Sequence, residues 1–443
     1  MLDSARITAA LIILVTLASC ATTGPKPPPT GTPTATLVIT PGIPVLAQAA
    51  MPPGFEPIPF RPPLWLEGNE IAVSGVQAGR TIVAGLSGGF QHRRILAADG
   101  GPPVPGGALM DFAASPDGLA VVSLVSGPAA KHLDVVLRTL SAADEGKRIA
   151  SFDQPFQSVS LAWPESQTIA LGIEALQPSA PEAPGPAGTP AKSDLYFIAA
   201  GNGSTEQVSL NCRLRRLSWS PDGAYAVGEG GGDAPVVIVD RRQQACHPVN
   251  VRAPIRVLDW APKRNAFLYA GAIPGSTITG VFEYDIASGE SSPVAVSSSG
   301  AVYNRDGAIV ALGNAQLSRQ RVLEHSGIPA TAELALMRPA QGQTRVIPLG
   351  ISTLASMLAS STMVRSPGFD SIAIDLFAAG AMGPVQNIIA YSLASATAIL
   401  VAAGHARGLV LMSWSADGKT LAIFDGDSHR STLTLVTPFS GAR

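Results

Sequence analysis

Leu217-Ser218-Trp219-Ser220-Pro221-Asp222-Gly223 is the stretch of sequence that decides the fold. Its first half alternates large apolar side chains with serines, which is typical of a β-strand with one buried face. Its proline presets φ for a turn, its aspartate can bond nearby backbone amides, and its glycine accepts positive φ. The small apolar run at residues 224–227 follows. The stretch therefore predicts a strand, a tight turn and a second strand.

Degraded copies of this pattern recur along the chain, spaced by roughly 40 to 60 residues, which is the length of one four-stranded propeller blade. Weaker copies lie at residues 64–69, 161–166, 258–264 and 364–369. The copies with an Asp-Gly turn end at Asp117 and Gly118, Asp222 and Gly223, Asp306 and Gly307, and Asp417 and Gly418. Because the same residue types recur at equivalent positions, we interpret these aspartates and glycines as structural turn residues.

The repeat resembles the TolB-like and WD-type β-propeller repeats, from about Leu64 to the end of the chain. The Trp-Ser-Pro-Asp-Gly form that begins at Trp219 is most similar to the bacterial periplasmic TolB type. The resemblance implies an all-β propeller of four-stranded blades and a surface that binds other macromolecules.

The last repeat offers three strands, at residues 411–414, 421–424 and 432–436, before the chain ends. Propellers usually complete such a blade with a strand from the amino-terminal end, which removes an open sheet edge. Residues 36–40 are apolar enough to supply that strand in an eight-bladed ring. Strands within residues 71–96 would do so in a seven-bladed ring. We prefer eight blades.

The first 20 residues resemble a bacterial lipoprotein signal peptide. Arg6 gives a thin positive end, residues 7–17 are apolar, and Leu17-Ala18-Ser19-Cys20 resembles a lipobox in which Cys20 takes the lipid. A plain secretory signal is the alternative. Residues 21–63, rich in Pro and Thr, are expected to be a tether, and residues 64–443 a single propeller domain. We therefore expect an exported protein, anchored by lipid alone to a bacterial membrane and facing the periplasm or the cell exterior.

Composition limits the partners of this chain. Only 14% of its 443 residues are charged, and the formal net charge is −2. This balance argues against a nucleic-acid partner, which would need a clustered basic face.

We expect a monomer. The Pro- and Gly-rich residues 177–192 and the polar residues 313–331 are expected to be inserted loops.

Cysteine use leaves one question open. With Cys20 lipidated, Cys212 and Cys246 remain, and an exported pair invites a disulfide. Cys212 precedes the first strand of a predicted blade and Cys246 follows the third, so the two lie in different parts of the repeat. A bond between them stays an open alternative.

Catalytic and metal-binding patterns are weak. Gly85-Leu86-Ser87-Gly88-Gly89 matches the hydrolase elbow, but strand-like residues follow where the elbow needs a helix. Residues 425–429 begin like a calcium loop and lack its later ligands. The tryptophans Trp163, Trp219, Trp260 and Trp414 are expected to pack in the core. We assign no catalytic residue, no metal and no cofactor.

Two functions remain. The preferred one is a cell-envelope lipoprotein, not an enzyme, whose propeller binds a protein, peptide or glycan of the envelope. The alternative is a propeller enzyme with an axial active site, acting as a hydrolase, a lyase or a quinone-dependent dehydrogenase.

Overall fold

A computed structural model describes residues 37–38 and 45–440, apart from 60, 88, 102–103, 128–130, 141–145, 177–192, 232–233, 250, 252–254, 274–278, 296–297, 299, 314–328, 339–342, 359, 381–382, 406–408 and 427–430. The expected signal peptide, Cys20 and most of the expected tether lie outside the described residues. So do the first expected loop and most of the second.

The described chain folds into eight β-sheets, which are the eight blades. Blade one holds β4 (Leu64–Trp65), β5 (Ile71–Gln77), β6 (Arg80–Ser87) and β7 (His92–Ala98), and blade two holds β8 (Ala108–Ala114), β9 (Ala120–Ser126), β10 (His132–Thr139) and β11 (Lys147–Asp153). Blade three holds β12 (Phe156–Glu165), β13 (Thr168–Ala175), β14 (Ser193–Ala199) and β15 (Thr205–Leu210), and blade four holds β16 (Arg215–Trp219), β17 (Tyr225–Gly231), β18 (Ala234–Asp240) and β19 (Ala245–Pro248). Blade five holds β20 (Ile255–Trp260), β21 (Ala266–Ala272), β22 (Thr279–Asp285) and β23 (Glu290–Ala295), and blade six holds β24 (Ala301–Tyr303), β25 (Ile309–Gly313), β26 (Pro329–Arg338) and β27 (Gln343–Leu354). Blade seven holds β28 (Thr362–Arg365), β29 (Ser371–Gly380), β30 (Gly383–Ser392) and β31 (Thr397–His405), and blade eight holds β32 (Leu409–Trp414), β33 (Leu421–Gly426) and β34 (Ser431–Val436).

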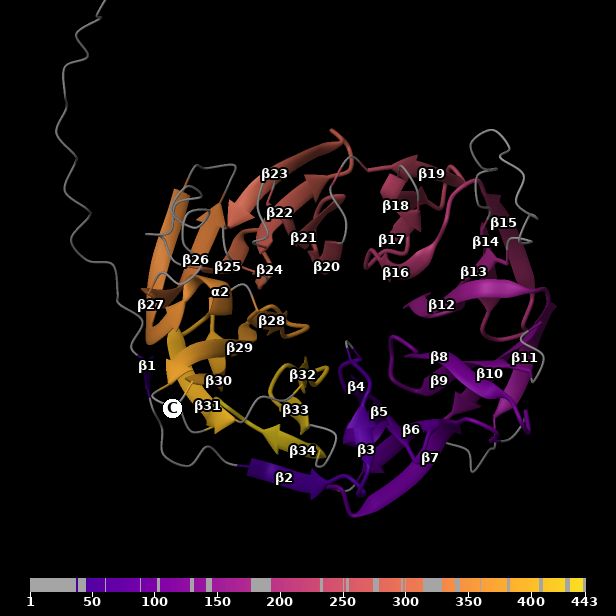
Figure 1. Ribbon diagram of the computed structural model, residues 1–443, viewed down its shortest axis with the longest axis horizontal. Helices are drawn as coiled ribbons and strands as arrows, with labels where there is room; N and C mark the ends of the chain where they lie inside the picture. The colour runs from indigo at the N-terminus through magenta and orange to yellow at the C-terminus, as the bar shows by residue number, and fades with distance from the viewer. Residues whose placement is uncertain are drawn as a thin grey trace, which may run out of the picture. The chain divides into compact units, whose positions relative to one another are not determined.

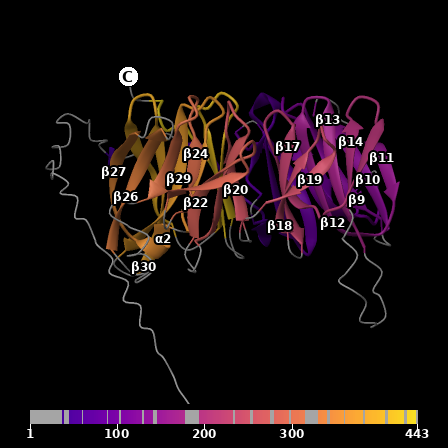
Figure 2. The same ribbon diagram turned by 90° about the horizontal axis from the view of Figure 1, so that it is seen from above.

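These blades form a ring, and the first strand of each blade lies nearest the axis (Figure 1). Seen edge-on, the strands run along the height of the ring (Figure 2). Helix is confined to η1 (Glu67–Asn69) and α2 (Ala355–Leu358) within the described residues. The predicted all-β propeller of eight four-stranded blades is therefore confirmed. Among the described helices, none has the length and apolarity to cross a membrane.

The ring is closed by β2 (Val45–Ala50), which pairs antiparallel with β34 and supplies the fourth strand of blade eight. The expected closing strand, residues 36–40, was the wrong choice: within it, β1 (Leu37–Val38) pairs in parallel with β31 as a fifth strand of blade seven. The physical reason is connectivity. The chain passes from β2 through β3 (Phe55–Pro57), which pairs with β5, so the strand next to blade one is the one that reaches blade eight.

The apolar core is divided among the seams between blades. Each of eight buried clusters joins two neighbouring blades, from blades one and two through to blades eight and one. Trp163, Trp260 and Trp414 are buried in three of these clusters, and Trp219 packs against a fourth. Burial of apolar surface therefore holds blade to blade, as the repeated positions of these rings predict.

Three of the four Asp-Gly turns are held by a serine hydroxyl. Ser220 Oγ donates to Asp222 Oδ1 at 2.6 Å and accepts the backbone N–H of Tyr225 at 3.0 Å. Gly223 has φ +63°, and the other three turn glycines are also at positive φ. The turns that contain Asp117 and Asp417 repeat the serine contact at 2.6 Å.

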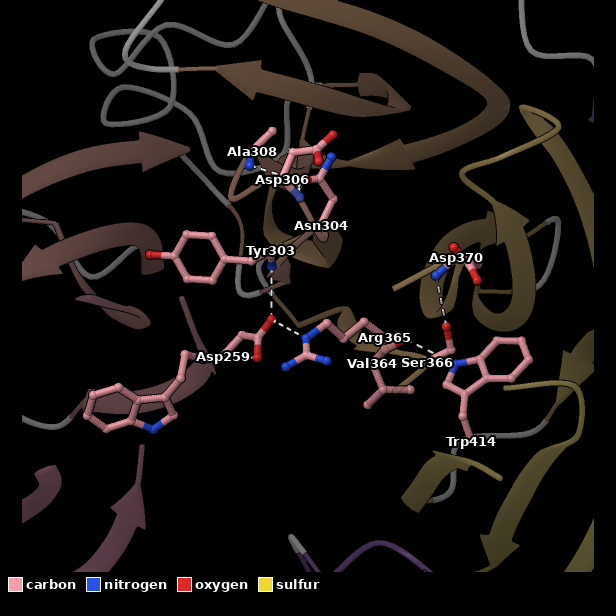
Figure 3. A network of polar contacts seen from close by, with 11 residues as sticks. Asp259, Tyr303, Asn304, Asp306, Ala308, Val364, Arg365, Ser366, Asp370 and Trp414 are labelled. Carbon is pink, nitrogen blue, oxygen red and sulfur yellow. Dashed lines mark hydrogen bonds and ion pairs between the residues drawn. The ribbon is translucent and has the colours of Figure 1, made fainter. Parts of the chain in front are cut away.

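The turn at Asp306 is built differently. Asn304 Oδ1 accepts the backbone N–H of Asp306 at 3.0 Å and that of Ala308 at 2.8 Å (Figure 3). The amide of Asn304 thus supplies the acceptor that a serine hydroxyl supplies elsewhere.

Asp222→Ala should lower the free energy of unfolding by about 1 kcal/mol, because it removes the acceptor of Ser220 and of the backbone N–H of Ala224. Chemical denaturation measures the change. Asp306→Ala is the matched control and should change stability by less than about 0.5 kcal/mol. Equal losses in the two variants would contradict this account of the turns.

Acid should weaken the same turns. Hydrogen bonds from Ser115 and Ser415 lower the pKa values of Asp117 and Asp417 below the ordinary range. A carboxylate whose folded pKa is lowered contributes stability above its unfolded pKa, and that contribution disappears as pH falls through the folded pKa. The stability difference between the wild type and the Asp117→Asn, Asp417→Asn double variant should therefore shrink below about pH 4. Denaturation at a series of pH values tests this, and a constant difference would contradict it.

Candidate functional site

A cavity of about 460 Å³ opens on the axial wall of blades two to five. Its lining comes from β8, β12, β16, β17 and β20, together with the segment between β3 and β4. These are mainly first strands, which face the axis (Figure 1). The charged residues that line it are Arg61, Asp111, Arg216, Glu229 and Arg256.

Arg61 and Asp111 form an ion pair on one side of this axial cavity. Asp111 follows a bulge in β8, and its two oxygens accept the backbone N–H groups of Phe112 and of Leu161 in the next blade, each at 2.8 Å. Burial raises the pKa of the Asp111 carboxyl above its ordinary value, although Arg61 and both N–H groups oppose the shift. The guanidinium of Arg61 also lies 5.5 Å from the centre of the Phe112 ring. Asp111 thus ties two blades together and fixes Arg61 in the cavity.

Arg216 and Glu229 face each other on the wall of blade four, with 3.1 Å between Arg216 Nη1 and Glu229 Oε1. A bulge in β16 takes Arg216 out of the regular ladder, and the residue has φ +51°. The Arg216 side chain is 80% exposed. Left-handed backbone costs energy for any residue other than glycine, and such strain gathers at functional sites.

Arg256 adds a third cation from blade five. Burial lowers the pKa of the Arg256 guanidinium below its ordinary value. An arginine keeps its charge in proteins even so. The lining therefore carries three guanidinium groups and two carboxyl groups.

The two serines of the lining serve the fold. Ser160 Oγ accepts the backbone N–H of Leu217 in the next blade at 3.2 Å. Ser218 Oγ accepts Trp260 Nε1 at 3.2 Å. Neither contact is with a base that would activate a serine for attack.

An arrangement like that of Asp111 recurs around Asp259 in blade five (Figure 3). Asp259 accepts the backbone N–H groups of Trp260 and Tyr303, each at 2.9 Å, and Arg365 Nε lies 2.7 Å from its carboxylate. Burial raises the pKa of Asp259, and Arg365 opposes this. The contacts bridge blades five, six and seven, and none of these residues lines the axial cavity, so we interpret this network as structural.

Cys212 and Cys246 are joined by a disulfide, with Cα atoms 6.4 Å apart. Cys212 lies just before β16, and Cys246 lies in β19, the outer strand of the same blade. The bond therefore ties the entry of blade four to its outer strand.

The weak catalytic patterns fall in ordinary strands and turns. Ser87 ends β6 and pairs with His92 across a hairpin, so no helix follows it. Asp425 lies in β33, and residues 427–430 of the calcium-like segment lie outside the described residues. In the described part of the chain, no group of three or more metal-ligating side chains is found.

Gly85, from the same elbow-like segment, has a packing role. A Cβ added at this glycine would lie 2.1 Å from Glu70 Oε1, and Arg94 Nε holds that oxygen at 2.8 Å. Gly85→Ala should therefore lower the free energy of unfolding by about 1–3 kcal/mol through overpacking. Ser87→Ala is the control and should change it by less than about 0.5 kcal/mol. Thermal denaturation separates the two variants, and an equal loss of stability in both would contradict the packing role of Gly85.

Sequence reasoning missed all five charged residues of the axial cavity. Three of them lie in first strands, Glu229 lies in the second strand β17, and Arg61 lies in the segment before β4, and in all these places the expected pattern is only apolar alternation. The consecutive pair Arg215 and Arg216 inside a strand that faces the axis was the available signal. The other four have no local signature, because their proximity depends on ring closure.

The comparisons with known proteins show the fold. No family model matches the chain, and no curated protein matches it. Among solved structures, an oligogalacturonate lyase in complex with manganese is similar over 87% of this chain and 90% of its own, with 12% identity and a TM-score of 0.51. TolB from Acinetobacter baumannii is similar over 80% of this chain and 76% of its own, with 13% identity and a TM-score of 0.32. Dipeptidyl peptidase 4 from Porphyromonas gingivalis is 11% identical, with a TM-score of 0.48, over 82% of this chain and 57% of its own.

TolB is among the solved structures that this chain is similar to. The prediction that the chain is not an enzyme is contradicted, because the solved structures similar to this chain over most of its length include an enzyme, the oligogalacturonate lyase. That prediction depended on finding, in the repeats, no acid, base or nucleophile that occurs at one position only. The axial cavity holds a set of such groups, and its members come from several blades, so a comparison of one repeat with another does not reveal it.

Proposed function

We propose that the protein is an enzyme that works in its axial cavity on a carboxylate-bearing substrate. The observation that carries this proposal is Arg216, whose exposed side chain lines the cavity and whose backbone is strained. A strained arginine with its side chain 80% exposed adds little to stability, so a role in binding explains its presence. Guanidinium groups bind carboxylates through paired, charge-assisted hydrogen bonds.

Glu229 is the group we propose for acid–base chemistry. It lines the cavity 3.1 Å from Arg216, and its side chain is 34% exposed, so a bound substrate can reach it. A carboxylate beside the cation that holds the substrate is suited to take or give a proton close to the bound acid group. Arg256 supplies a second positive charge there. Of the enzyme classes expected from the sequence, this arrangement favours a lyase or a hydrolase driven by a carboxylate.

We also propose that the protein acts outside the cytoplasm, anchored at Cys20. The disulfide between Cys212 and Cys246 supports an oxidising compartment. An acidic glycan or peptide of the cell envelope is then the expected source of the substrate.

Arg216→Gly tests the site without disturbing the fold, because glycine accepts φ +51° freely. The variant should be at least as stable as the wild type and should bind galacturonate, a simple sugar acid, about 10- to 100-fold more weakly. Calorimetry with the full chain measures the binding. Arg305→Ala, in an exposed turn of blade six, is the matched control. Wild-type affinity in Arg216→Gly would show that the site is wrongly placed.

Glu229→Gln tests the chemistry. With galacturonate oligomers as substrate, turnover followed by chromatography should fall by about 10²-fold or more, while binding changes only a few-fold. Binding by the wild type without any turnover would contradict the enzyme proposal and leave the binding site standing.

A further inference from the structure

Arg216 lies in a β-bulge, and the residues on its two sides decide where it points. In the pairing of β16 with β17, Arg216 and Leu217 stand opposite the single residue Gly228. A bulge of this kind bends the strand and re-aims a side chain, often beside an active site. Arg216 takes φ +51° there, and its side chain lines the axial cavity. The contacts of the flanking residues Arg215 and Leu217 therefore fix the position of the Arg216 guanidinium.

Leu217 is held by blade three. Its backbone N–H donates to Ser160 Oγ of β12 at 3.2 Å. Its side chain lies between two glycines: a Cβ added at Gly228 would lie 2.8 Å from Leu217 Cδ2, and a Cβ added at Gly172 of β13 would lie 3.2 Å from Leu217 Cδ1. The Leu217 side chain thus occupies space that both strands leave open, and the carboxy-terminal side of the bulge is fixed against blade three.

Arg215 is held by Glu174, a fully buried carboxylate of β13. Arg215 Nε donates to Glu174 Oε2 at 2.6 Å, and Arg215 Nη2 donates to Glu174 Oε1 at 3.3 Å. Ser158 Oγ also donates to Oε2, at 2.7 Å, and Arg213 Nε lies 3.5 Å from Oε1. Paired, charge-assisted hydrogen bonds fix the direction of a guanidinium as well as its distance. Glu174 therefore fixes the amino-terminal side of the bulge.

A carboxylate is not part of the repeat at this place. Aligned without gaps, the repeats of blades two and four have Val125 and Gly230 at the position of Glu174. Replacing a buried ion pair with apolar side chains is often neutral or stabilising, so such a pair is weak evidence of a stabilising role. The paired hydrogen bonds to Arg215 add what an apolar contact lacks, which is a defined direction.

We propose that Glu174 is a positioning residue for the axial site. Through Arg215 it holds the bulge from which Arg216 binds a carboxylate of the substrate. Glu174 itself does not line the cavity. This inference rests on the proposed function, because Glu174 acts only through Arg216. It goes beyond that function by naming a residue of the neighbouring blade on which the affinity of the site depends.

Glu174→Gln is the decisive variant, because it keeps the size of the side chain and removes the charge that pairs with Arg215. The full chain is titrated with galacturonate by calorimetry, and thermal denaturation is followed in parallel. Glu174→Gln should bind galacturonate about 5- to 10-fold more weakly than the wild type. Added to Arg216→Gly, it should weaken binding by no more than about twofold further, because the guanidinium that it positions is already gone.

Glu70→Gln is the matched control. Glu70 is also a buried carboxylate held twice by one arginine, with Arg94 Nε at 2.8 Å and Arg94 Nη2 at 2.5 Å, and it does not line the axial cavity. Glu70→Gln should lower the melting temperature about as much as Glu174→Gln does and leave the affinity for galacturonate unchanged.

Arg215→Lys is a second variant, and it carries the test if Glu174→Gln does not fold. A lysine keeps the positive charge beside Glu174 and loses the paired geometry of the guanidinium. The variant should therefore weaken binding in the same direction as Glu174→Gln, and again only while Arg216 is present.

The outcomes separate the two proposals. If Arg216→Gly weakens binding and the folded Glu174→Gln variant binds like the wild type, the positioning role is wrong and the proposed function stands. Equal weakening by Glu174→Gln with and without Arg216, or a matching loss in Glu70→Gln, would show a general effect on the fold and would also overturn the positioning role. If the wild type does not bind galacturonate, or if Arg216→Gly binds it as tightly as the wild type, both proposals fail.

Discussion

The pairing of β2 with β34 is the constraint on which the ring depends. Seven blades draw their four strands from consecutive chain, but blade eight has only three strands until residues 45–50 join it. This seam is reinforced by Ser431, whose hydroxyl donates to the backbone oxygen of Phe55 at 2.7 Å and whose backbone oxygen accepts the N–H of Met51 at 2.9 Å. Without it, blade eight would present a bare sheet edge, and the first strands would not be held around one axis.

Polar side chains on the first strands have two kinds of role, and their hydrogen bonds distinguish one role from the other. Where an aspartate accepts backbone N–H groups from its own blade and from the next, as Asp111 and Asp259 do, it replaces ladder hydrogen bonds that a bulge removes. Arg216 has no such duty: its backbone is strained and its side chain is exposed. The Arg216 side chain instead pairs with Glu229 on the wall of the axial cavity. Arg61 shares features of both kinds, because Asp111 holds it by an ion pair on the wall of the same cavity.

Sequence predicts the features of this protein that are local. The turn at Asp222 and the buried ring of Trp260 could be predicted because proline, aspartate, glycine and tryptophan each act within one hairpin. The eight copies of this pattern then predict the propeller architecture. The closing strand was misplaced because apolar strength was weighed above connectivity, and residues 36–40 are the more apolar stretch. The axial site was missed because Arg61 and Arg256 come together only through the ring.

The closing strand also fixes when folding can finish. Ribosomes make β2 among the first strands and β34 last, and the partners Val45 and Val436 stand at opposite ends of the sequence. Loop closure over such a separation is entropically costly and slow. Until the carboxy-terminal residues emerge, β2 has no partner and blade one lacks its neighbour, while the intervening blades can already stack. Until β34 is made, the nascent chain therefore remains an open arc of blades with an exposed sheet edge at each end. During that time it is prone to aggregation.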